Sequence, residues 1–169
     1  STLFPYTTLF RSYGRALLES CLADARAQGR SGVCMLGAEK QKAWLSDQAF
    51  AQKHGFETVD ETDYGYALLA RSFDGTLPRF TDRAMAGIIE TKALTVYYSD
   101  QCPYVANSLD IIRQVCGELG VPYSLVQVDT REKAKSLPCV FNNCAVFYDG
   151  VFQTVNLPDA AWLRRLLKR

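Results

Sequence analysis

The chain has 169 residues, of which 48% are hydrophobic and 22% are charged, and its formal net charge is +1 at pH 7. This composition is typical of a globular protein and argues against intrinsic disorder. A charge so close to zero gives no electrostatic basis for binding nucleic acid or an anionic membrane surface. No apolar run approaches the ~18 residues of a transmembrane helix, and no secretory signal opens the sequence. We therefore expect a cytoplasmic protein without nucleic-acid or membrane partners.

The cysteines fit a reducing compartment, because no two of the six form a C-x-x-C pair. His54 is the single histidine, so a zinc site of the usual spacing is not expected and no metal is predicted. We expect most of these thiols to be small buried hydrophobes. They are Cys21, Cys34, Cys102, Cys116, Cys139 and Cys144.

The first part of the chain alternates helical and extended patterns. The predicted elements are a helix over 14–28, a buried strand over 32–36, a helix from Ser46 to Gly55, and strands over 56–60 and 64–73. The next stretch, 74–92, is rich in turn residues and is predicted to be a linker with a short helix over 84–89.

A second unit is predicted over 93–169. Its elements are a strand over 93–99, a helix over 104–119 ended by Gly120, a strand over 122–130, a short helix over 131–137, a hairpin over 144–157 and a closing helix over 158–169. The hairpin is indicated by Asp149-Gly150 between two apolar runs. The order β-α-β-α-β-β-α resembles a minimal thioredoxin-type domain, so the fold class is α/β.

The stretch "YGRALLESC" suggests a glycine turn at Tyr13 and Gly14 that leads into a helix. Such a turn directs unpaired N–H groups and the positive end of the helix dipole outward, which suits a phosphate or pyrophosphate. The alternative is an ordinary loop before an amphipathic helix.

"YGRALLESCLADARAQG", "GVCMLG" and "FAQKHGFETVD" together resemble the C-terminal half of the Gcn5-related N-acetyltransferase (GNAT) family. That family holds the pyrophosphate of acetyl-CoA in a Q/R-x-x-G-x-G/A turn. The overlay places Leu9 and Ser12 at the first two motif positions and Gly14 at the last. The resemblance implies acetyl-CoA contacts from Tyr13, Gly14, Arg15 and Ala16. It also leads us to expect a truncated GNAT domain over 13–73 that binds acetyl-CoA weakly or not at all.

The family's general acid is a tyrosine in a Y-x-x-x-G-F element, and here Ala51 stands at that position. Tyr64 and Tyr66 are weak substitutes, with the alternative that both are strand tyrosines packed against a helix. His54 precedes a helix end and is not expected to be catalytic.

Cys102 lies directly after a predicted strand and before a helix, where the helix N-terminus favours a thiolate. "C-P-Y-V" resembles the glutaredoxin "C-P-Y-C" site with Val105 in place of the second cysteine. Cys139, which follows Pro138, is a better resolving candidate than Cys144. In thioredoxin-like folds a cis-proline in that region faces the active cysteine. The alternative is a buried thiol in a binding domain.

The whole combination over 13–169 resembles acetyltransferases with a C-terminal YoaP-like domain. The resemblance implies an acetyl-CoA-dependent transferase that acts on a small-molecule or peptide amine and carries an appended thioredoxin-like module. Two other hypotheses remain open for that module: a monothiol redox unit with a thiol partner, and a non-catalytic module that binds peptides or thiols.

The first dozen residues do not fit this family. Residues 2–12 resemble a translated sequencing-library adapter, so they are set aside as a non-native segment that marks where the acetyltransferase was cut. If ordered, the segment is expected to pair as a strand, because Thr, Phe and Tyr favour strands.

Overall fold

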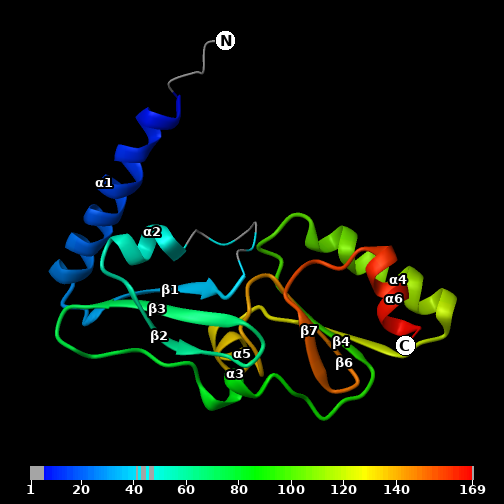
Figure 1. The fold of residues 1–169 in the computed structure, drawn as a ribbon. Helices are drawn as coiled ribbons and strands as arrows, with labels where there is room; N and C mark the ends of the chain where they lie inside the picture. Colours follow the sequence, from blue (N-terminus) through cyan, green and yellow to red (C-terminus); the bar gives the residue numbers. More distant parts are fainter. Residues whose placement is uncertain (1–5, 41, 43–44, 46–47, 169) are drawn as a thin grey trace. The chain divides into compact units, whose positions relative to one another are not determined.

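The computed structural model describes residues 6–40, 42, 45 and 48–168, with side chains from residue 13 onward (Figure 1). The chain divides into two compact units, Ser1–Phe80 and Thr81–Arg169, and the division falls inside the predicted linker 74–92. Helices and strands are mixed in both units, which confirms the predicted α/β class.

The first unit contains one three-stranded antiparallel sheet of order β1-β3-β2. Its elements are α1 (Tyr6–Ala27), β1 (Gly32–Ala38), α2 (Gln48–Lys53), β2 (Glu57–Glu61) and β3 (Tyr66–Ser72). The three predicted strands are confirmed. β3 lies in the centre, which is why its first five residues are all buried.

β1 was predicted to be buried, and this is wrong in part. Within the described part of the chain it pairs with β3 alone, so it is an edge strand, and Cys34 in its middle is exposed. A short apolar run does not tell whether a strand lies in the centre or at the edge of a sheet. The expectation that most thiols are buried fails for Cys21 too, which is exposed on α1.

α1 begins earlier than the sequence predicted, and the glycine turn at Tyr13–Gly14 is wrong. The helix runs without interruption from Tyr6 to Ala27, so Tyr13, Gly14, Arg15 and Ala16 lie in its middle. One glycine costs a helix only about 1 kcal/mol, which good helix formers on either side offset. The expectation of a strand before Ser12 is also wrong for the described residues 6–12; residues 1–5 lie outside the described part.

The core of the first unit is built by one face of α1, by α2 and by β3. Leu22 and Leu69 are fully buried in it, together with Phe56. α2 ends as predicted at Gly55, where the N–H of Phe56 donates to the carbonyl of Ala51 over 3.1 Å. The predicted N-cap of this helix, Ser46, lies outside the described residues.

The second unit contains a four-stranded sheet of order β5-β4-β6-β7. β4 and β5 are parallel, whereas β4–β6 and β6–β7 are antiparallel. The elements are α3 (Asp82–Ala86), β4 (Leu94–Tyr98), α4 (Val105–Leu119), β5 (Tyr123–Gln127), α5 (Arg131–Lys135), β6 (Cys144–Tyr148), β7 (Val151–Thr154) and α6 (Ala160–Leu167). From β4 onward the order is β-α-β-α-β-β-α, as the sequence predicted.

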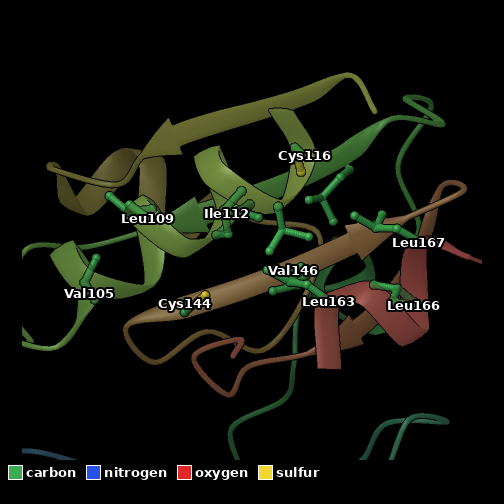
Figure 2. Close-up of a cluster of buried hydrophobic side chains, with 12 residues drawn as sticks. Val105, Leu109, Ile112, Cys116, Cys144, Val146, Leu163, Leu166 and Leu167 are labelled. Atoms are coloured by element: carbon green, nitrogen blue, oxygen red, sulfur yellow. The ribbon is translucent and has the colours of Figure 1, made fainter. Parts of the chain in front are cut away.

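Figure 2 shows the core between α4, α6 and one face of this sheet. Every third or fourth residue of α4 points into it, and α6 contributes three leucines. The labelled members are Val105, Leu109, Ile112, Cys116, Cys144, Val146, Leu163, Leu166 and Leu167. We call this set, with Leu94, Val96 and Val115, the α4–α6 cluster.

The predicted hairpin turn is confirmed at Asp149 and Gly150. Both have positive φ angles, 51° and 79°, which is the geometry that a two-residue turn between twisted strands requires. The predicted helix near 84–89 is found slightly earlier, as α3, where the Thr81 side chain caps it by accepting from the N–H of Ala84.

Candidate functional site

Cys102 lies where the sequence predicted, between the end of β4 and the start of α4. Its carbonyl accepts a hydrogen bond from the N–H of Val105 over 3.1 Å. The side chain is half-buried and packs against the α4–α6 cluster. The activation of its thiol stays a prediction.

Cys144, and not Cys139, belongs to the α4–α6 cluster against which Cys102 packs. Cys144 belongs to the α4–α6 cluster that Cys102 contacts, and it is paired with Tyr98 across β4 and β6. Cys139 is not a member of that cluster. Alternation along β6 could have indicated this, because Cys144 and Val146 share one face of the strand. The role of Cys139 as the resolving cysteine stays a prediction.

Burial governs the chemistry of both partner cysteines. It raises the pKa of the Cys139 thiol to about 12, with a smaller contribution from Cys144. It raises the pKa of the Cys144 thiol to about 12 as well. Both thiols are therefore protonated at neutral pH, and neither is a ready nucleophile. The peptide bonds of the described residues are trans, including the one before Pro138, which differs from the cis-proline of thioredoxin-like folds.

A cavity of about 690 Å³ is lined in part by the residues that precede Cys102, Ser99 to Gln101, and sequence reasoning did not find it. It lies at the carboxyl ends of the parallel strands β4 and β5 and extends to α5. Its walls come from three segments: Ser99 to Gln101, Gln127 to Arg131 with Ala134, and Phe141 with Asn142. The signal was present in the sequence, because polar residues follow both strands and the carboxyl ends of parallel strands meet at one edge.

The two carboxylates in this cavity have different partners. Oδ1 of Asp129 lies 2.7 Å from Nζ of Lys133, and this hydrogen bond holds the pKa of the Asp129 carboxyl below its usual value. Asp100 accepts a hydrogen bond of 2.5 Å from the side-chain amide of Gln127. Asp129 is thus neutralised by a cation, whereas Asp100 is bonded to an uncharged amide.

In the first unit, the residues predicted to contact acetyl-CoA lie along the middle of α1. Tyr13 is exposed, and the Arg15 guanidinium lies 4.0 Å from the carboxylate of Glu19. In a helix interior the backbone N–H groups bond to carbonyls one turn earlier, so they do not form an anion site in this conformation. The cofactor assignment itself stays a prediction.

Tyr64 lies in the turn before β3 and Tyr66 is the first residue of the strand; their ring centroids are 5.8 Å apart. Tyr66 is only 4% exposed, and its N–H donates to Oγ1 of Thr62 over 3.0 Å. It lines a cavity of about 270 Å³ together with Glu39 and Glu61. Buried strand packing, which was the alternative at the sequence level, describes Tyr66 well, yet its position at a polar cavity keeps it among the candidates.

The described residues bear on metal binding and on membrane insertion. No group of three His, Cys, Asp or Glu side chains there could hold a metal ion. None of the helices in this described part has the length and apolarity needed to cross a bilayer.

Comparisons with known proteins bear on both units. A protein-family model described as YoaP-like matches residues 122–165, within the second unit. The uncharacterized N-acetyltransferase YoaP of Bacillus subtilis (strain 168) is 29% identical over 157 residues, which cover 92% of this chain and 62% of that protein. The chain thus spans less than two thirds of this relative's length.

Shorter matches also occur. The tRNA-specific 2-thiouridylase MnmA of two strains of Streptococcus equi subsp. zooepidemicus, MGCS10565 and H70, is 38% identical over 65 residues, which cover 38% of this chain and 17% of each enzyme. No solved structure matches the chain. The chain is therefore similar, over most of its length, to a protein named as an N-acetyltransferase, and its second unit carries a YoaP-like segment.

Proposed function

We propose that the chain belongs functionally with acetyl-CoA-dependent N-acetyltransferases of the GNAT type. The similarity over 92% of the chain carries this proposal, because it extends through both units and not only through the YoaP-like segment. The acceptor would be the amine of a small molecule or a peptide. Tyr64 and Tyr66 are the candidates for protonating the departing CoA thiolate, and Tyr66 lines a polar cavity.

α1 is the element that should hold the pyrophosphate, and its continuity through Gly14 argues against tight binding by this 169-residue chain. Calorimetric titration with acetyl-CoA tests both the proposed function and the weak binding expected of this chain. The titration is done on the chain and, for comparison, on the full-length B. subtilis relative. We expect micromolar binding and amine-dependent CoA release from the relative, and weak or no binding from the chain. If the relative shows no acetyl-CoA-dependent transfer to any amine, the function is wrong. If the chain binds in the micromolar range, our account of α1 is wrong.

We propose that the second unit is thioredoxin-like, since its element order and its β5-β4-β6-β7 sheet support that architecture. One observation favours a thiol role beside the transferase: Cys102 is partly exposed between β4 and α4. Mixed-disulfide formation with a small aromatic disulfide, measured for wild type and for Cys102→Ser, tests this role. If mixed-disulfide formation is equally fast in wild type and in Cys102→Ser, the thiol role is wrong and the unit is a non-catalytic binding module.

A further inference from the structure

The cavity at the carboxyl ends of β4 and β5 has a buried polar residue in its lining. Ser99 is only 5% exposed, and its backbone N–H donates to the carbonyl of Asn143 over 2.9 Å. Side chains alternate along β4, so Ser99 lies on the face opposite Val96 and Tyr98, which pack at the α4–α6 cluster. Ser99 itself lines the cavity, so a buried hydroxyl lies beside the charged side chains at this edge of the sheet.

Two oppositely charged side chains of the lining, Asp100 and Arg131, have no ionic partner within the described part of the chain. Asp100 accepts only from the amide of Gln127, and Arg131, the first residue of α5, forms no ion pair within the described residues. Asp129 differs, because Lys133 already neutralises it at 2.7 Å. The cavity therefore offers one free carboxylate and one free guanidinium.

We propose that this cavity binds a small zwitterion of the amino-acid or dipeptide class. The ligand's ammonium group donates to Asp100, and its carboxylate accepts two parallel hydrogen bonds from the guanidinium of Arg131. The Ser99 hydroxyl bonds to a polar atom between the two ends. Phe141 and Val128 supply an apolar wall for the ligand's side chains. The volume of about 690 Å³ lies within the range of small-molecule sites. This binding does not depend on acetyl transfer.

The proposal is tested by titrating the whole 169-residue chain with the dipeptide L-alanyl-L-alanine. Binding is measured by calorimetry and by changes in the amide chemical shifts. We expect saturable shifts at Ser99, Asp100, Thr130 and Arg131. N-acetyl-alanyl-alanine lacks the ammonium group and alanyl-alanine amide lacks the carboxylate, so each should bind at least about tenfold more weakly. Equal binding of all three peptides, or no saturable shift at millimolar dipeptide, overturns the proposal.

Substitutions test which end of the dipeptide each charged residue binds. Asp100→Asn and Arg131→Gln are surface changes that should preserve the fold, and each should weaken the dipeptide about tenfold or more. N-acetyl-alanyl-alanine has the carboxylate but no ammonium group, so Asp100→Asn should leave its binding unchanged. The matched controls Asp110→Asn and Arg113→Gln alter an exposed ion pair on α4, outside the cavity, and should leave binding unchanged. Loss of binding in the controls equal to that in the cavity variants contradicts the assignment.

Discussion

Gly14 on α1 lies against the ring of Phe50 on α2: a Cβ added at Gly14 would meet Cζ of Phe50 at 3.5 Å. That distance is an ordinary van der Waals contact, and Gly14 is in the interior of a helix. We expect Gly14→Ala to stabilise the first unit by roughly 0.5–1 kcal/mol, because glycine loses more backbone entropy in a helix than alanine does. Thermal and urea unfolding followed by circular dichroism measure this change.

Gly117→Ala is the matched control for that prediction. Gly117 also lies inside a helix, α4, and its added Cβ would meet nothing within 4 Å. It should stabilise the second unit by a similar amount. If Gly14→Ala destabilises the protein while Gly117→Ala stabilises it, Gly14 serves a turn and our description of α1 is wrong.

Gly150→Ala should destabilise the hairpin between β6 and β7. The φ angle of Gly150 is 79°, and an added Cβ would lie 2.8 Å from the carbonyl oxygen of Ile89. Strain of this kind costs on the order of 1–3 kcal/mol. Asp149→Asn, which tolerates the same left-handed backbone, should change the free energy of unfolding by less than about 0.5 kcal/mol. Urea denaturation followed by tryptophan fluorescence in a Trp44→Phe background, where Trp162 is the remaining tryptophan, compares the two, and equal effects would contradict the turn geometry.

The cysteines should react with iodoacetamide in an order set by their burial. In the native protein at pH 7.5 we expect Cys21 and Cys34 to be modified because they are exposed, and Cys102 to react as a half-buried thiol. The buried thiols Cys116, Cys139 and Cys144 should be modified only after denaturation. Peptide mass spectrometry over time gives the order. Native-state labelling of Cys144 before Cys102 would show that the α4–α6 cluster is open.

Alkaline pH should weaken the second unit through Cys139 and Cys144. Their folded pKa values of about 12 lie above the ordinary value of 9.0, so between these limits the folded state holds protons that the unfolded state releases. The free energy of unfolding therefore falls as the pH rises from 9 toward 12. Urea unfolding at pH 8, 9.5 and 10.5 should show a smaller fall in Cys139→Ala/Cys144→Ala than in wild type. An identical fall in both proteins would mean that other groups cause it.

Much of the second unit was predictable because local signals agreed with one another. Gly120 after an amphipathic run ended α4, and Asp149-Gly150 placed the hairpin. In the first unit, Gly55 ended α2 by the same logic. Signals of this kind depend on a few neighbouring residues, so a single sequence contains them.

The sequence-based predictions were wrong or incomplete where contacts between residues far apart in the chain determine the structure. Gly14 looks like a turn residue locally, but its contact with Phe50 and its helical neighbours favour the helix interior. The edge position of β1 depends on which strands pair, and the cavity near Ser99 depends on how β4 and β5 align. No local pattern contains that information.

The buried clusters described above never mix residues from the two halves of the chain. The cluster around Leu22 and Leu69 draws on residues before Phe80, and the α4–α6 cluster draws on residues after it. We therefore expect each half to unfold with its own midpoint, so that an unfolding curve of the whole chain would sum two transitions. Trp162 lies on α6 in the later half, so in a Trp44→Phe variant tryptophan fluorescence would follow that half alone and need not coincide with the far-ultraviolet signal. A single midpoint quoted for this protein would describe neither half.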